Sequence, residues 1–283
     1  MIAKDTLARF CLLNDISGEP ALKAEEFFDF ESTFEDKDLS GIFELSLWEL
    51  ADRVDKVTAE KIYSAVKSDF AEVLKNLEHF GINIIGKNDL SFPKKLTEKL
   101  KTEAPQFLYT VGDTSLLKSV GAAVVGSRDL SEKCEKFAYD IGETIAKENK
   151  TLISGGAKGA DITATKSAIK NGGKAVWFAA VPMSQMLKRK NVFDWLKQEK
   201  LCLCSDFNPF GDFTGEKALR RNKYIYAQAD TAFVCQCKSR ISGTFSGANY
   251  CLKNNLSELF VYNNGSDAEK YLINNGAVEI IDR

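Results

Sequence analysis

Short apolar segments alternate with amphipathic segments in the middle of the chain. Residues 122–125, 151–154 and 175–179 are mostly apolar or β-branched, as expected of strands that are buried on both faces. Between the first two, residues 132–148 place an apolar side chain at every fourth position, which predicts an amphipathic helix with Ser131 at its N-cap. Strands that alternate with helices in this way predict a parallel sheet with right-handed crossovers, and thus a doubly wound, Rossmann-like α/β fold.

The same alternation continues toward the C-terminus. Strands are predicted at residues 201–204, 231–235 and 259–262, the last being the final core strand. A loop is expected at residues 182–190. Helices are predicted at residues 191–200, 217–229, 245–254 and 268–275.

The beginning of the chain has a different pattern. Apolar positions recur at helical spacing in residues 7–14, 21–28, 43–51 and 58–80. Residues 82–85 and 107–111 then resemble strands, and Pro93 opens a helix between them. We therefore expect a small all-helical N-terminal domain at residues 1–80 and a Rossmann-like domain at residues 81–283.

Two glycine-containing turns follow the first two core strands. Both would leave the carboxyl edge of a parallel sheet, where ligands bind, and glycine lets backbone amides approach an anion closely. Each turn alone is also compatible with ordinary turn chemistry, and neither matches a dinucleotide-binding or P-loop motif. Asp161 follows as a helix cap or a partner for a sugar hydroxyl. Together the turns predict a phosphate-bearing ligand held by Gly126, Ser127, Arg128, Gly155, Gly156, Lys158 and Gly159.

Further candidates for anion binding lie later in the chain. The start of the predicted helix 217–229 carries four cations, and positive charge at a helix N-terminus is unfavourable because it opposes the helix dipole. A bound phosphate would offset this cost. The four cations are Lys217, Arg220, Arg221 and Lys223. A third turn offers hydroxyls and amides from Ser242, Gly243 and Thr244. The basic run 188–190 is either a nucleic-acid rim or a solvated helix end. Three loop phenylalanines either stack on bases or pack back on the protein: Phe207, Phe210 and Phe213.

Composition restricts the classes of function. The chain has 283 residues and a net charge of −2, so any DNA site must be a local basic patch. Its one histidine, His79, is expected at a helix end. The sequence therefore gives no support for a Ser-His-Asp or Cys-His catalytic site. The seven cysteines include two C-x-C pairs, compatible with a metal site or with core packing, and reduced thiols in the cytoplasm are expected. Neither a signal peptide nor a membrane-spanning apolar run is expected.

Several motifs, in order, resemble the DNA-processing protein A family, also called Smf. Residues 125–128 (V-G-S-R) and 154–161 (S-G-G-A-K-G-A-D) are similar to its paired signature. Arg220, Arg221, Asn222 and Lys223 resemble its R-R-N-R element, and residues 242–244 its S-G-[ST] turn. The lead-in segments 92–96 and 107–113 agree, so that the resemblance covers about residues 82–262. Gly156 and Lys223 depart from the usual bulkier apolar residue and arginine.

The resemblance implies a protein without enzymatic activity or cofactor that binds single-stranded DNA, protects it and hands it to the RecA recombinase, in DNA uptake or recombination. It also implies a homodimer in the cytoplasm and an N-terminal module similar to sterile-alpha-motif or helix-hairpin-helix folds. The glycine-rich hairpin turns of a DNA-binding helix-hairpin-helix are not evident in this sequence, so we expect the module to serve packing or protein interaction. A C-terminal winged helix, which is frequent in the family, is not expected. The residues carried over as facing DNA or phosphate are Gly126, Ser127, Arg128, Gly155, Gly156, Lys158, Gly159, Arg220, Arg221, Asn222, Lys223, Ser242, Gly243 and Thr244.

Two other functions stay open at this point. One is a nucleotide-processing enzyme similar to phosphoribohydrolases, which residues 241–247 disfavour because they lack that group's P-G-G pattern and catalytic glutamate. The other is a sensor of a small nucleotide on the same fold, with the N-terminal helices coupled to a partner.

Overall fold

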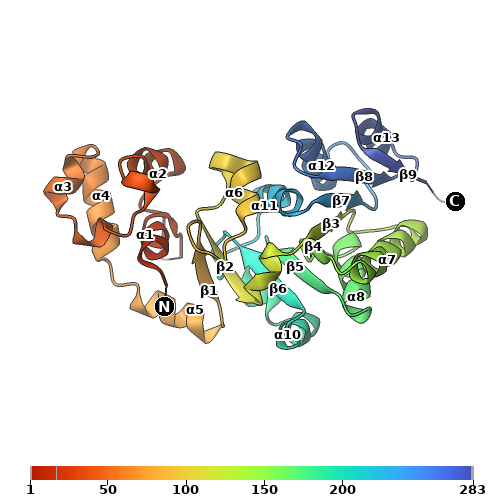
Figure 1. Cartoon of the computed structure of the whole chain (residues 1–283), viewed down its shortest axis with the longest axis horizontal. Coiled ribbons are helices and arrows are strands. Elements are labelled where there is room, and N and C mark those ends of the chain that lie inside the picture. Colours follow the sequence, from red (N-terminus) through yellow and green to blue (C-terminus); the bar gives the residue numbers. More distant parts are fainter. Residues whose placement is uncertain (1, 17, 282–283) are drawn as a thin grey trace. The chain divides into compact units, whose positions relative to one another are not determined.

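A computed structural model describes residues 2–16 and 18–281, which form two compact units (Figure 1). The N-terminal unit comprises residues 1–92, 105–110 and 206–211. The sheet unit comprises residues 93–104, 111–205 and 212–283.

Helices dominate the N-terminal unit. They are α1 (Lys4–Leu13), α2 (Ala24–Glu31), α3 (Leu47–Ala51), α4 (Lys56–Lys67) and α5 (Ala71–His79), with 3-10 turns at Glu35–Lys37 and Ile42–Glu44. They enclose a core of fully buried side chains that includes Leu12, Phe27, Phe30, Ile42, Leu50 and Ile62. The prediction of one helix over residues 58–80 is wrong. The chain turns extended at Ser68, and the Asp69 carboxylate accepts a hydrogen bond from the Ala71 amide at 2.8 Å, which starts a new helix.

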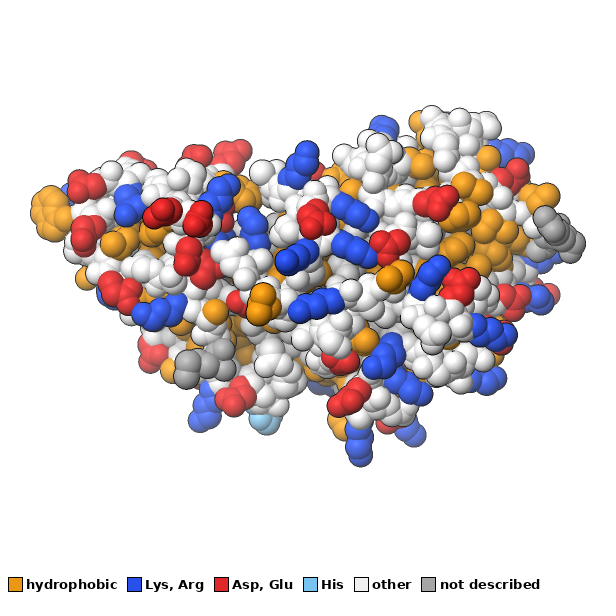
Figure 2. All heavy atoms as spheres, in the orientation of Figure 1, with side chains coloured by type: hydrophobic (Ala, Val, Ile, Leu, Met, Phe, Trp, Pro, Cys, Tyr) orange, Lys and Arg blue, Asp and Glu red, His pale blue; other side chains and the backbone are white. Residues whose placement is uncertain are grey.

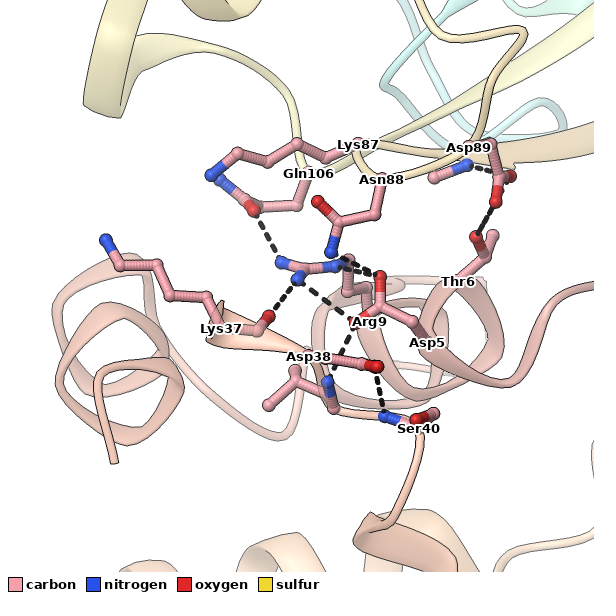
Figure 3. Close-up of polar contacts among 12 residues, drawn as sticks. Asp5, Thr6, Arg9, Lys37, Asp38, Ser40, Lys87, Asn88, Asp89 and Gln106 are labelled. Carbon is pink, nitrogen blue, oxygen red and sulfur yellow. Dashed lines mark hydrogen bonds and ion pairs between the residues drawn. The ribbon is translucent and has the colours of Figure 1, made fainter. Parts of the chain in front are cut away.

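One buried arginine organises the polar interior of this unit (Figure 3). Arg9 is fully buried, and its five N–H groups find five acceptors. Two go to the Asp5 carboxylate at 2.8 and 3.1 Å, one to Glu31, one to the Gln106 side chain at 2.9 Å and one to the Lys37 carbonyl at 2.7 Å. Burial alone would lower the pKa of Arg9, but the hydrogen bonds and charges of Asp5 and Glu31 outweigh it and raise the pKa.

The sheet unit is built on seven parallel strands in the order β6-β5-β4-β3-β7-β8-β9. A parallel sheet with the strand order reversing beside β3 is the doubly wound architecture predicted from sequence. Another pair, β1 (Asn83–Gly86) and β2 (Phe107–Gly112), is antiparallel. The seven parallel strands are β3 (Gly121–Val125), β4 (Thr151–Ser154), β5 (Lys174–Phe178), β6 (Leu201–Ser205), β7 (Thr231–Val234), β8 (Glu258–Tyr262) and β9 (Val278–Ile280).

The strand β9 corrects the expectation that residues 259–262 form the final core strand. Its three residues pair in parallel with β8, in the register Phe260 to Val278 and Tyr262 to Ile280. Two of the three are exposed, so the segment lacks the buried apolar run that identifies the other core strands in the sequence.

Helices cover both faces of the sheet, with α7 and α8 together on one face and α11 and α12 on the other (Figure 1). Gly142 of α7 permits the close packing of the first pair, because a Cβ there would lie 2.2 Å from the Ala164 carbonyl oxygen of α8. Ser131 caps α7 as predicted, accepting from the Cys134 amide. The helices are α6 (Lys94–Leu100), α7 (Glu132–Lys147), α8 (Ala160–Lys170), α9 (Met183–Met186), α10 (Lys190–Lys197), α11 (Gly215–Gln228), α12 (Gly243–Lys253) and α13 (Asp267–Asn274).

Two details complete the fold. The segment 182–190, expected as a loop, contains α9, whose Met183 and Met186 are buried. Among helices in the described parts of the chain, none combines the length and apolar character needed to cross a membrane.

The seven cysteines are free thiols and all are buried. Cys202 and Cys204 lie on one face of β6 with their sulfur atoms 3.6 Å apart, and burial raises the pKa of Cys204. Within residues 2–16 and 18–281, three or more His, Cys, Asp or Glu side chains nowhere gather closely enough to hold a metal ion.

Candidate nucleic-acid interface

The turns after β3 and β4 meet at the carboxyl edge of the sheet. The Ser127 carbonyl accepts a hydrogen bond from the Ala160 amide at 3.3 Å. Gly159 has a φ of +88°, and a Cβ there would lie 2.2 Å from the Ser127 oxygen, while a Cβ at Gly126 would lie 2.7 Å from the Ala160 Cβ. These two glycines therefore let the turns touch, which is a structural reason for their presence beside the site.

The larger cavity at this edge, about 900 Å³, is the strand groove. Its floor includes Gly155, Gly156 and Ala157, and its walls come from α8, the α9–α10 segment and α11. Asp194 is its one carboxylate among the described lining residues. Its lining cations are Arg128, Lys158, Lys166, Arg189, Lys190 and Arg221. Figure 2 shows lysine and arginine side chains over the region of α10 and α11, interrupted by acidic ones.

Arg221 lines the wall of this groove but is almost completely buried. Only 8% of the residue is exposed, and its Nη1 donates to the Phe178 carbonyl oxygen at 3.1 Å and lies 4.0 Å from the Asp161 Oδ2. Burial lowers the pKa of Arg221, whereas the Asp161 charge raises it. A guanidinium stays protonated in proteins, so this side chain supplies a fixed positive charge.

Asp161 does not have the capping role that was one of its two predicted roles. It lies in the first turn of α8 behind the N-cap residue Gly159, so the capping expectation is wrong. Its Oδ2 accepts from the amides of Gly155 at 3.2 Å and Ala157 at 3.3 Å. Burial raises the pKa of Asp161, and Arg221 opposes that rise. Two amides of the glycine turn therefore bind an internal carboxylate, so they are already occupied within the protein.

A second cavity of about 550 Å³, which we name the α12 cavity, adjoins the first across Arg128, Ala157 and Arg221. Ser242 caps α12 by accepting from the Phe245 amide at 3.1 Å, as its position in the turn suggests. Of the residues predicted from sequence, this cavity collects Gly126, Ser127, Arg128, Arg221, Asn222, Ser242, Gly243 and Thr244.

Three predicted site residues line neither cavity. Gly159 is used in the turn contact described above. The Arg220 Nε donates to the Tyr224 hydroxyl at 2.9 Å. Lys223 forms an ion pair with Glu103 and lies 4.5 Å from the centre of the Tyr250 ring. Of the predicted site cations on α11, Arg221 lines both cavities, whereas Arg220 and Lys223 contact other partners because they point in other directions from the helix.

Two of the three loop phenylalanines have different surroundings. Phe213 is 44% exposed, lines the strand groove and has the Arg128 guanidinium 5.8 Å from its ring centre. Phe210, in contrast, packs edge-on against Phe80 at 5.3 Å within the N-terminal unit. Phe213 is thus an exposed ring in the strand groove, whereas Phe210 packs within the N-terminal unit.

Some lining residues were missed by the sequence analysis or left undecided. Lys166 was missed, although it follows Ile162 at helical spacing and the two line the groove together. Tyr226 was also missed, and it lines the α12 cavity. Two residues of the basic run, Arg189 and Lys190, belong to the groove wall, with the Arg189 Nη1 3.5 Å from the Gly156 carbonyl oxygen.

The charge of the chain is divided between the units. The sheet unit has 28 Lys and Arg against 20 Asp and Glu, a net charge of +8. The N-terminal unit has 10 against 20, a net charge of −10. The overall value of −2 therefore conceals a basic sheet unit.

Comparisons with known proteins point to one family. DNA processing protein DprA of Streptococcus pneumoniae is 30% identical over 145 residues, an alignment that spans 49% of each chain, about half of that relative's length. Protein Smf of Borreliella burgdorferi is 26% identical over 231 residues, covering 78% of this chain and 68% of the relative.

Solved structures show the same fold. DprA of S. pneumoniae has a TM-score of 0.76 at 22% identity, over 99% of this chain and 95% of that one. DNA processing protein A of Helicobacter pylori, described for its single-stranded DNA binding mode, has a TM-score of 0.60 at 25% identity, over 71% of this chain and 92% of that one. The sequence model of the DNA recombination-mediator protein A family matches residues 83–282. The chain therefore belongs to the DNA recombination-mediator protein A family.

Proposed function

We propose that this chain binds single-stranded DNA along the strand groove. The observation that carries the proposal is a set of five groove cations that form no ion pair with a carboxylate of the described chain: Arg128, Lys158, Lys166, Arg189 and Lys190. Unpaired cations around one cavity leave a strong positive potential, and nucleic-acid phosphates are the polyanions that such a surface attracts. The family and the DNA-binding relative from H. pylori support the same choice of ligand.

Binding would combine charge with stacking. Arg128 and Lys158 would neutralise successive phosphates, while Phe213 offers a ring to an unstacked base. A duplex keeps its bases stacked inside, so the aromatic contact favours single strands. We propose binding without covalent chemistry and without a cofactor.

We further propose that two copies associate through one face of the sheet. Phe233, Phe260 and Val278 are neighbours across β7, β8 and β9 on that face, and the rings of the first two stack at 5.2 Å. Val278 is 44% exposed and Ile281 is 62% exposed. Figure 2 shows a group of hydrophobic side chains over this region (orange, between α7 and α13). Contiguous apolar surface of this kind is typical of a homodimer interface.

Protection of the bound strand and its transfer to the RecA recombinase during DNA uptake or recombination are the roles we propose from the family resemblance, with a cytoplasmic location. They depend on strand binding, which is the step to test first.

Fluorescence anisotropy with labelled oligothymidine over a salt series tests the proposal. We expect single strands to bind more tightly than duplex of equal length, with log Kd changing with log salt by about 0.7 per phosphate contacted. Equal affinity for both, or no binding, would overturn it. The nucleotide-sensor alternative is checked by thermal shift against nucleotides, and the enzyme alternative by release of ribose phosphate.

A further inference from the structure

Two buried polar groups without partners border the α12 cavity. Tyr226 is fully buried, and its hydroxyl has no hydrogen-bond partner in the described chain. The Nε of Arg221, which is more than nine-tenths buried, also has none. A buried polar group left unpaired costs about 1–3 kcal/mol, so two beside one cavity indicate groups that a ligand completes.

The same cavity has the features of an anion site. The N-terminus of α12, an eleven-residue helix, opens into it through Ser242, Gly243 and Thr244, where backbone amides and the helix dipole favour negative charge. Arg128, Arg221 and Lys238 add positive charge. Two carboxylates of the described chain also line the cavity, and both face a cation: Asp129 pairs with Lys238 at 3.0 Å, and Asp161 lies 4.0 Å from Arg221. A volume of about 550 Å³ is in the range of small-ligand sites.

The two unpaired groups are deeply buried, and this burial favours the end of a DNA strand over an internal phosphodiester as the ligand. An internal phosphodiester carries a nucleotide on each side, so it must lie where the strand can enter and leave. A group that reaches the fully buried Tyr226 has protein on its far side, since α12 packs there so closely that a Cβ at Gly247 would lie 3.0 Å from the Tyr226 Cε2. Only a terminal group fits such a position.

We propose that the α12 cavity binds a phosphate monoester, presented either by the phosphorylated end of a DNA strand or by a free mononucleotide. The phosphate would accept hydrogen bonds from Tyr226, Arg221 Nε and the first amides of α12. Asn222 and Asp129 are in the lining to meet sugar hydroxyls. The strand-end source rests on the proposed function, because the strand must lie in the adjoining groove; the mononucleotide source does not.

The test uses the full chain and one oligothymidine sequence with a 5′-phosphate, a 3′-phosphate or no terminal phosphate. We expect one phosphorylated form to bind about tenfold more tightly than the unphosphorylated strand, the size of one hydrogen bond to a charged group. Thymidine monophosphate and inorganic phosphate, each measured by thermal shift, report on the free ligand.

The variant Tyr226→Phe removes the unpaired hydroxyl and keeps the ring. We expect it to abolish the preference for the phosphorylated end, with the thermal midpoint unchanged or raised. Tyr109→Phe is the matched control, because the Tyr109 hydroxyl is also buried and unpartnered in the described chain but lies outside the cavity. It should keep the preference.

The outcomes separate the two proposals. Failure of every oligonucleotide to bind contradicts the strand groove, and the thymidine monophosphate measurement then still tests the cavity. Binding of all three oligonucleotides with equal affinity, together with no thermal shift by thymidine monophosphate, overturns the monoester site alone. A Tyr226→Phe protein that keeps the preference overturns it as well.

Discussion

The guanidinium of Arg221 lies where the side chain of Gly155 would begin. A Cβ built on Gly155 would fall 1.0 Å from the Nη1 of Arg221. The glycine therefore does more than shape a turn after β4, because its missing side chain is the space in which the buried cation of α11 reaches the carboxyl edge of the sheet.

Gly155→Ala is expected to displace Arg221 and to weaken binding of single strands about tenfold, with a loss of stability of about 1–3 kcal/mol from the clash. Anisotropy and urea unfolding measure the two effects. Gly215→Ala at the start of α11 is the control, since nothing lies within 4 Å of a Cβ there. Equal binding by both variants would contradict the proposed role of Arg221.

Arg128→Ala should lower the affinity for oligothymidine and reduce the salt slope by about 0.7, the loss of one phosphate contact. Arg220→Ala should leave the affinity and the salt slope nearly unchanged, because the Arg220 side chain donates to the Tyr224 hydroxyl. The salt series described above measures them. A larger effect at Arg220 than at Arg128 would place the DNA on another surface.

Phe213→Ala removes the ring beside Arg128 and is expected to cost about 1–3 kcal/mol of binding free energy per stacked base, without changing the salt slope. Phe210→Ala should instead lower the free energy of unfolding, because that ring packs on Phe80. Anisotropy and thermal unfolding of both variants test whether Phe213 contributes to binding and Phe210 to stability. Loss of affinity in Phe210→Ala alone would reverse the assignment.

Phe260→Glu places a charge in the middle of the exposed apolar face of β7, β8 and β9. We expect it to convert a dimer into a monomer, as measured by sedimentation velocity, because a buried unpaired charge opposes association. Lys147→Glu on α7 is a control for a surface charge change, since Lys147 pairs with Glu143 and its side chain is 67% exposed. A monomeric wild-type protein at high concentration would contradict the interface.

Arg9→Met is expected to destabilise the N-terminal unit by about 3–5 kcal/mol, because it leaves the carboxylates of Asp5 and Glu31 without their buried partner. Lys61→Met breaks an exposed pair with Glu26 and should cost no more than about 1 kcal/mol. Chemical unfolding monitored by circular dichroism compares the two. Similar losses would mean that the Arg9 network contributes little.

The alternation of apolar runs and amphipathic segments was sufficient to predict the α/β class, most of the strands and the turns at their carboxyl ends. The reason is that a doubly wound sheet repeats one local pattern, and the ligand edge follows from strand direction alone. The strand β9 was not predicted because it is short and exposed. The break at residues 68–70 was not predicted because the segments on both sides of it have a helical pattern. The division at residue 80, and the DNA-binding residues themselves, stay predictions.

By itself, the sequence determined which turns carry glycine and cations, because backbone permissiveness and charge are properties of residue types. Only the tertiary structure decided which of those cations face a cavity. Lys223 is neutralised by Glu103, 120 positions away, and the amides of Gly155 and Ala157 are occupied by Asp161. Partners of this kind depend on how helices pack on the sheet, and local spacing carries no information about them.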